Sequence, residues 1–89
     1  STLQQSAKIT TQGTIVDSKG EPLIGVSILE VGTTNGTITD IDGKFTLRVA
    51  SGATLEISYI GYKTAEFKAD NRDLAKIMLK EDNGYFDNG

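Results

Sequence analysis

Residues 44–59, KFTLRVASGATLEISY, hold the two most regular strand patterns in the chain. In each half of this stretch, apolar residues alternate with charged or polar ones, and ASGA at residues 50–53 separates the halves. Alternation with period two places apolar side chains on one face of a β-strand. The stretch therefore predicts two strands joined by a turn. Their core-facing residues are Phe45, Leu47, Val49, Leu55, Ile57 and Tyr59.

The same signature extends in both directions along the chain. Short runs rich in Val, Ile, Thr, Tyr and Phe alternate with Gly-containing turns, a rhythm typical of an all-β sandwich. The expected strands are residues 10–17, 25–31, 37–39, 44–49, 55–59, 63–68 and 74–80. Only residues 71–75 could form a helical turn, and isolated short helices are marginal. We therefore expect an all-β fold, a small Greek-key β-sandwich of about seven strands.

Several turns between these strands have a specific chemistry. In Gly20-Glu21-Pro22, Gly20 can take a positive φ and Pro22 cannot donate to a strand ladder. Asn35-Gly36 is the strongest short hairpin signal, because both residues tolerate the positive φ of a type I′ turn. Gly61, between Ile60 and Tyr62, predicts a bulge or tight bend.

Three further strands have a less regular pattern than residues 44–59. At residues 25–31, apolar residues occur on both faces, which predicts cover on both sides near Val31. At residues 63–68, Lys63, Ala65 and Phe67 share one face, and the pattern leaves open which face turns inward. At residues 74–80, Ala75, Ile77 and Leu79 share one face. Four lysines lie along the strands that we expect to be outer strands. Charges on outer strands discourage edge-to-edge pairing, so these lysines favour a monomer. They are Lys63, Lys68, Lys76 and Lys80.

The two ends of the chain lack this alternation. Residues 1–8, STLQQSAK, are polar and aperiodic and are interpreted as a flexible leader. Residues 82–89, DNGYFDNG, are rich in Asn, Asp and Gly and are interpreted as a tail or linker. The predicted domain is therefore residues 9–81.

Composition excludes several classes of function. The 89 residues include no Cys and no His, which removes disulfides and the commonest zinc ligands. The net charge is −3 and the nine Lys and Arg residues are scattered, whereas nucleic-acid binders carry a basic stripe. No apolar run approaches the roughly 20 residues that span a bilayer. We expect one domain, held by packing alone, that binds no nucleic acid.

Asp40 and Asp42 are the only candidate metal ligands that the sequence suggests. Hard cations prefer clustered carboxylates, but with Gly43 at the sixth position of an EF-hand loop the first and twelfth positions fall on Ile38 and Val49. A turn with side-chain hydrogen bonds from the Asp residues explains the pattern better. A different kind of ion site stays open as the alternative.

No catalytic apparatus is apparent. Without His, nucleophilic catalysis would need a buried Lys or a carboxylate as base, and Lys44, Lys63 and Lys76 alternate with strand residues as outward charges do. A sugar-stacking platform is the second alternative, although the expected core explains Tyr59 and Phe67. Its candidate residues are Tyr59, Tyr62, Phe67, Tyr85 and Phe86. We therefore expect neither an enzyme nor a cofactor.

Five ordered blocks carry a resemblance to a known family. They are GTIVD at residues 13–17, GEPLIGV at 20–26, GTTNGT at 32–37, TDIDGKF at 39–45 and SYIGY at 58–62. These blocks resemble the carboxypeptidase-regulatory-like domain, in the form found at the start of SusC/RagA-type TonB-dependent outer-membrane proteins of Bacteroidetes. The resemblance implies a transthyretin-like, or prealbumin-like, sandwich, in agreement with the strand count from pattern. The motif residues in question are Gly20, Pro22, Gly25, Gly36, Asp40, Gly43, Phe45, Tyr59, Gly61 and Tyr62.

The resemblance also implies a place and a role. Such domains lie on the periplasmic side of the bacterial outer membrane, after a signal peptide and before the TonB box and plug of an importer for glycans or peptides. The implied partners are the plug and barrel of the parent transporter, and beyond them a surface lipoprotein or a TonB-system protein. The tail GYFDNG lacks the Val-rich segment expected of a TonB box. A carbohydrate- or ion-binding module of a surface or periplasmic protein is the alternative function.

Overall fold

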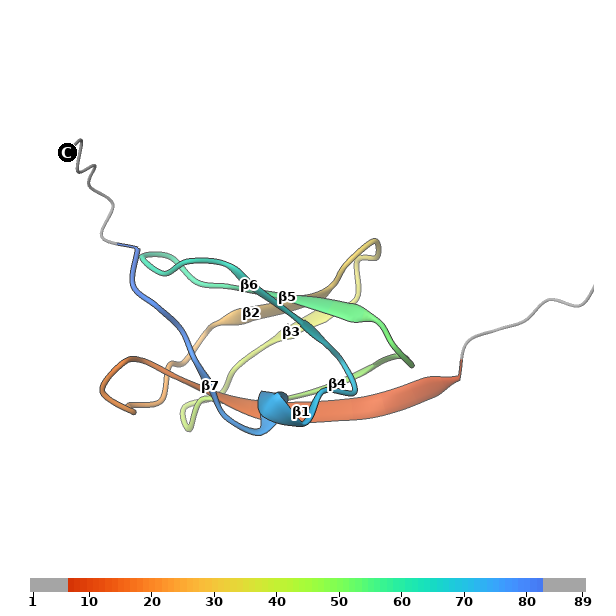
Figure 1. Ribbon diagram of the computed structural model, residues 1–89, viewed down its shortest axis with the longest axis horizontal. Helices are drawn as coiled ribbons and strands as arrows, with labels where there is room; N and C mark the ends of the chain where they lie inside the picture. Colours follow the sequence, from red (N-terminus) through yellow and green to blue (C-terminus); the bar gives the residue numbers. More distant parts are fainter. Residues whose placement is uncertain (1–6, 83–89) are drawn as a thin grey trace, which may run out of the picture.

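The computed structural model describes residues 7–82, which form a two-layered β-sandwich (Figure 1). In chain order, the elements are β1 (Lys8–Val16), β2 (Ser27–Glu30), β3 (Gly36–Ile38), β4 (Lys44–Ala50), β5 (Thr54–Ser58), β6 (Ala65–Lys68), the 3-10 helix η1 (Arg72–Ala75) and β7 (Ile77–Met78). Within residues 7–82, seven strands in two sheets confirm the predicted all-β sandwich.

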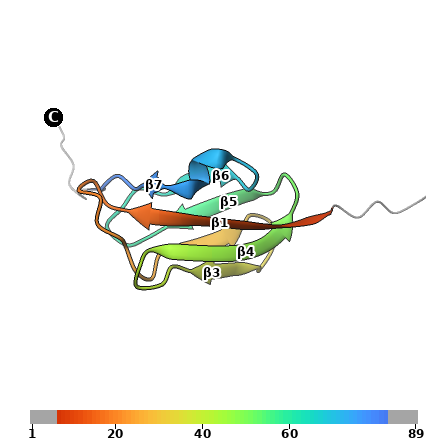
Figure 2. The same ribbon diagram turned by 90° about the horizontal axis from the view of Figure 1, so that it is seen from below.

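The two layers contain three and four strands. One sheet has the order β4-β1-β7 and the other the order β3-β2-β5-β6 (Figure 2). Neighbouring strands are antiparallel except β1 and β7, which are parallel. Ala7, just before the start of β1, accepts a hydrogen bond at its O atom from Ser51 N. Asp82 N donates to Gly61 O at the other end of the sandwich, beyond the end of β1. The described chain therefore begins and ends at opposite ends of the sandwich.

The core fills the space between the two layers. Its wholly buried apolar side chains come from both sheets and from the segments that follow β1 and β7, and are Ile15, Val26, Ile28, Val49, Leu55, Ile57 and Leu79. Buried polar side chains are satisfied: Thr11 Oγ1 donates to Ala69 O (2.9 Å), and Thr39 Oγ1 donates to Leu23 O (2.6 Å). Among residues 7–82, no buried polar side-chain atom lacks a hydrogen-bond partner.

The predictions for residues 44–59 are largely confirmed. Along β4, Phe45, Leu47 and Val49 are buried and the intervening residues are exposed. Leu55 and Ile57 are wholly buried on β5. Tyr59 lies just beyond β5 and is only partly buried, packed against the core.

The predicted type I′ turn at Asn35-Gly36 is wrong. Neither residue has a positive φ, and Gly32 has one instead (φ 86°). The chain reverses earlier, where Thr33 N donates to Glu30 O (3.1 Å). The physical reason is that the side chain of Asn35 has hydrogen-bond partners outside the turn, Glu30 Oε1 and Arg48 O, which hold the residue away from the positive φ of a type I′ turn.

The strand predicted at residues 74–80 is only partly correct. Residues 72–75 form η1, which begins with a cap in which Asn71 Oδ1 accepts from Asp73 N (2.9 Å). A side-chain cap of this kind stabilises the first turn of a helix. Ile77 and Leu79 are buried, whereas Ala75, predicted to share their face, is exposed in η1 and Leu74 is buried instead.

Two further strands are shorter than predicted. β2 ends at Glu30 and Val31 is 46% exposed, so the prediction of cover on both sides near Val31 is wrong. β6 begins at Ala65 instead of Lys63, because Lys63 N donates to Lys80 O (2.8 Å) and not to β5. Ala65 and Phe67 pack against the core, which settles the face of β6.

The ends of the domain differ slightly from expectation. β1 includes Lys8, and Ala7 is bonded to Ser51, so the described sandwich includes the last two residues of the stretch expected to be a leader. At the other end, Asp82 is bonded to Gly61. Residues 1–6 of the expected leader and residues 83–89 of the expected tail, with Tyr85 and Phe86, lie outside the described residues.

Candidate interaction surfaces

The carboxylate turn at residues 40–43 joins β3 in one sheet to β4 in the other. Asp40 Oδ1 accepts hydrogen bonds from Asp42 N and Lys44 N, both at 2.9 Å, which is the geometry of an Asx turn. Among residues 7–82, no group of three or more His, Cys, Asp or Glu residues could hold a metal ion. The turn therefore has a local structural explanation, and its two Asp residues do not form a cluster with a third acid.

Several motif residues meet at the end of the sandwich where β1, β3 and β5 finish. At Gly43, which has a φ of 74°, a Cβ atom would lie 2.6 Å from Ile15 O and 3.0 Å from Pro22 Cβ. A side chain at this position would therefore separate the loop after β1 from the start of β4. Gly20, Gly25 and Gly61 also have positive φ. The motif positions Gly36, at the start of β3, and Phe45, in the core, lie apart from this corner.

The aromatic residues do not form one flat platform. The rings of Tyr59 and Tyr62 lie 5.7 Å apart, centroid to centroid, and are tilted by 33°. Burial raises the pKa of the Tyr62 hydroxyl, and the negative charges of Glu81 and Asp17 raise it further. Phe67 lies on β6, and the remaining two aromatic candidates are outside the described residues. Of the three stacking candidates within residues 7–82, the structure therefore brings two rings together, those of Tyr59 and Tyr62.

Four exposed isoleucines gather at the end of the molecule that carries the motif corner. Thr39 O accepts from Gly25 N, so the loop before β2 runs beside the end of β3, and Ser27 pairs with both β3 and β5. The members of this isoleucine patch, with their exposed fractions, are Ile24 (55%), Ile38 (64%), Ile41 (75%) and Ile60 (90%). Large apolar side chains that cluster at a surface mark interaction sites. The last described residue, Asp82, is bonded to Gly61, next to Ile60.

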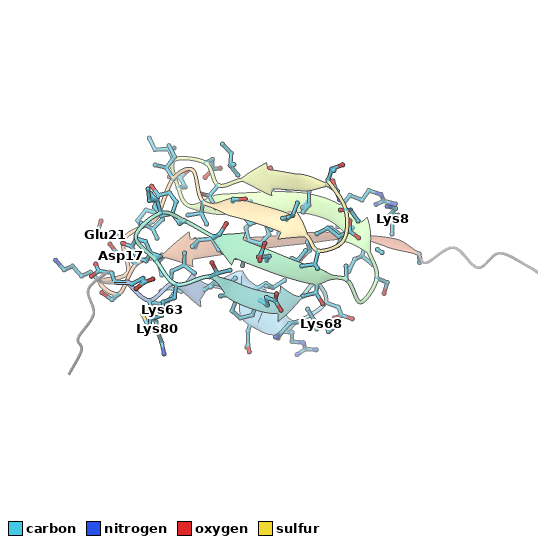
Figure 3. The ribbon with its side chains drawn as sticks, turned by 90° about the horizontal axis from the view of Figure 1, so that it is seen from above. Lys8, Asp17, Glu21, Lys63, Lys68 and Lys80 are labelled. Atoms are coloured by element: carbon cyan, nitrogen blue, oxygen red, sulfur yellow. The ribbon has the colours of Figure 1, made fainter. Side chains whose placement is uncertain are left out.

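A second surface feature lies on the long side of the sandwich, where β6 and β7 are the outer strands of their sheets. A groove of about 300 Å³ opens there, lined by Lys63, Thr64, Ala65, Phe67, Met78, Leu79 and Lys80. Lys63 N donates to Lys80 O (2.8 Å), so these two lysines are neighbours at one end of the groove, as Figure 3 shows. We call this feature the β6–β7 groove. The sequence placed lysines on these outer strands but did not indicate the apolar hollow between them.

Comparison with known proteins identifies the family. The sequence model of one protein family, the CarboxypepD_reg-like domain, matches residues 11–87, which is most of the chain. The chain belongs to this family of domains, which confirms the resemblance read from the five sequence blocks.

Its curated relatives are TonB-dependent receptors. The chain is 39% identical over 80 residues to the TonB-dependent receptor SusC of Bacteroides thetaiotaomicron, a match that covers 90% of this chain and 8% of the receptor. It is 38% identical over 76 residues to the TonB-dependent receptor P39 of Formosa agariphila, covering 84% of this chain and 7% of that protein. The chain therefore spans less than a tenth of the length of these relatives. Among residues 7–82, no helix is long and apolar enough to cross a membrane.

Proposed function

We propose that this chain is a non-catalytic, periplasmic accessory domain at the N-terminus of a TonB-dependent outer-membrane importer of glycans or peptides. The observation that carries the proposal is the pattern of similarity: four receptors match 76–90% of this chain, and the match covers only 7–8% of each. A chain that corresponds to so small a part of its relatives acts as one domain of a larger protein. Isolated, it is a monomer.

The isoleucine patch supports contact with the rest of the receptor. Exposed apolar clusters cost solubility unless a partner covers them. The patch lies at the end of the sandwich where the described chain finishes at Asp82, so whatever follows the domain in a receptor is its nearest neighbour. We therefore assign the patch to contact with the receptor segment that follows this domain.

Deletion of the domain tests the proposal. In the receptor that carries this chain, removal of residues 8–82 should leave the amount of barrel in the outer membrane unchanged and slow nutrient uptake when the nutrient is limiting. Uptake of labelled nutrient and immunoblots of outer-membrane fractions measure the two quantities. A deletion strain that imports at the normal rate would show that the domain is dispensable and that the proposal is wrong.

A matched pair of variants tests the role of the patch. Changing Ile41 and Ile60 to Ser should reproduce the uptake defect of the deletion without unfolding the domain, because both side chains are exposed. The control is Val31→Ser, which removes an exposed apolar side chain from the opposite end. An isolated chain that binds a polysaccharide or an ion, with uptake unaffected by the patch variants, would instead support the ligand-binding alternative.

A further inference from the structure

The free edge of β6 presents backbone groups to solvent. Ala69 N donates to Ala53 O, and the same register places Phe67 opposite Leu55 and Ala65 opposite Ile57. Residues of an antiparallel strand bond alternately to one side and the other, so these alternate positions bond to β5. Glu66, between them, therefore directs both its N–H and its C=O away from the sheet.

The facing edge of β7 has the same character. Leu79 N donates to Val16 O, and β7 pairs with β1 in a parallel register. Bonds to the neighbouring strand come from alternate residues, so Met78 directs its N–H and C=O to the free side. The side chain of Met78 is 55% exposed and lines the groove. Unpaired edges of this kind are templates for another strand.

On the opposite side of the sandwich, side chains occupy part of one strand edge. There, the outer edge of β4 is occupied: Asn35 Nδ2 donates to Arg48 O (2.8 Å), and Ala50 N donates to Glu30 Oε2 (3.2 Å). Asp40 Oδ1 takes the outward N–H of Lys44. On the β3–β4 side, groups of the protein itself thus occupy the edge of β4 at Lys44, Arg48 and Ala50. On the β6–β7 side, within residues 7–82, the bond between the two edges joins Lys63 N to Lys80 O.

The lining of the β6–β7 groove has one sign of charge. Its apolar residues are Ala65, Phe67, Met78 and Leu79, and its charged residues are Lys63 and Lys80. No carboxylate of residues 7–82 lines it, although a second hollow beyond Phe67 includes Glu66 and Lys68. Desolvated apolar walls beside two ammonium groups complement an apolar segment that carries carboxylates.

From these features we infer that the β6–β7 groove binds an extended, acidic and apolar peptide segment of a partner protein, which adds as a strand to the free edge of β6. Main-chain hydrogen bonds to Glu66 hold the segment, alternate apolar side chains enter the groove, and its carboxylates lie beside Lys63 and Lys80. Strand addition to an exposed sheet edge is an established mode of peptide recognition. The inference deepens the proposed function by naming the chemistry of a partner.

Titration of the isolated chain with a synthetic peptide tests this inference. The probe is acetyl-SEVDVES-amide, which alternates apolar and acidic residues, and its matched control is acetyl-SKVKVKS-amide. Two-dimensional NMR with up to about 1 mM peptide should show shifts confined to residues 63–67 and 76–80 for the acidic probe only. Raising the salt concentration should weaken the binding, because exposed charges are screened.

Variants of the chain separate the contribution of charge to peptide binding from the contribution of main-chain hydrogen bonds. Lys63→Gln with Lys80→Gln should weaken binding about fivefold, whereas Lys19→Gln with Lys44→Gln, which removes equal charge elsewhere, should not. Glu66→Pro removes the outward N–H without touching a β5 bond and should abolish binding while the melting temperature stays close to that of the parent.

Three results would overturn the inference. They are no shift at the highest peptide concentration, equal binding of the acidic and basic peptides, and shifts at groove residues on deletion of residues 83–89, which would show that the chain's own tail fills the groove. Because the titration uses the isolated chain, its failure leaves the deletion result in the receptor, and hence the accessory role, unaffected.

Discussion

Glu30 is a carboxylate in a place where the sequence suggested only a strand end. It is 6% exposed, accepts from Asn35 Nδ2 at Oε1 (2.9 Å) and from Ala50 N at Oε2 (3.2 Å). Asn35 Nδ2 also donates to Arg48 O. Glu30 and Asn35 belong to the sheet of β2 and β3, while Ala50 and Arg48 belong to β4. These two side chains therefore connect the two layers by hydrogen bonds.

The ionisation of Glu30 should make stability depend on acid. The hydrogen bond from Asn35, then that from Ala50 N, and the charge of Lys8 hold the pKa of the Glu30 carboxyl below its ordinary value. A group with a lowered folded pKa stabilises the protein fully above the unfolded pKa, near 4.3, and loses that contribution as the pH falls through the folded pKa. The melting temperature should fall from about pH 5 downward, and less steeply in Glu30→Gln.

The Glu30→Gln variant also has an expected effect on the melting temperature at neutral pH, and a matched control. At pH 7, Glu30→Gln should melt at a lower temperature than the parent, because its two donors reach different oxygens and one of these becomes an NH2 group, which cannot accept. Glu66→Gln, on the exposed face of β6, is the matched control and should change neither the melting temperature nor its pH dependence. Parallel curves for Glu30→Gln and the parent across the acid range would contradict the assignment.

At the scale of elements, η1 depends on one glycine of β1. Gly13 has an ordinary strand φ, but a Cβ atom there would overlap Leu74 O and lie 2.9 Å from Phe45 Cε2. The backbone of η1 thus lies directly on β1, with Leu74 buried beneath it. Glycine in a strand marks such a close approach of another backbone.

Gly13→Ala should displace η1 from β1. Overpacking against a backbone carbonyl cannot be relieved by a side-chain rotation, so the free energy of unfolding should fall by at least about 2 kcal/mol. Urea denaturation measures the change, with Gln12→Ala, an exposed neighbour on the same strand, as a control expected to stay within about 0.5 kcal/mol. Equal stability of the two variants would mean that η1 can move away at no cost.

The comparison of pattern with structure shows where sequence reasoning succeeds. β4 and β5 have strict alternation because one face is buried and the other solvated, and the pattern reports that directly. Asn35 and Leu74 could not be assigned in this way. Their conformations depend on partners 13 or more residues away in the chain, Arg48 and Gly13, which no local pattern reveals. The β6–β7 groove likewise lies between the outer strands of two different sheets, which only the packing of the two layers brings together.

At the scale of the whole molecule, the fold is stabilised without disulfides. The chain has no Cys, and Asp40 in the carboxylate turn already accepts two backbone hydrogen bonds. Calcium at about 5 mM should therefore leave the melting temperature unchanged, since only a ligand that binds the folded state raises it. Differential scanning calorimetry with calcium and with EDTA measures this, and a rise of several degrees with calcium would reveal an ion site.

β1 and β7 lie side by side and run in the same direction, while the described chain enters at one end of the sandwich and leaves at the other. A force that pulls Ala7 and Asp82 apart draws these two strands along their axes in opposite directions. The hydrogen bonds between them then share the tension and break together, because a sheared ladder has no leading bond that opens first. When its two ends are pulled apart, the folded domain therefore transmits the force from one end to the other until β7 separates from β1.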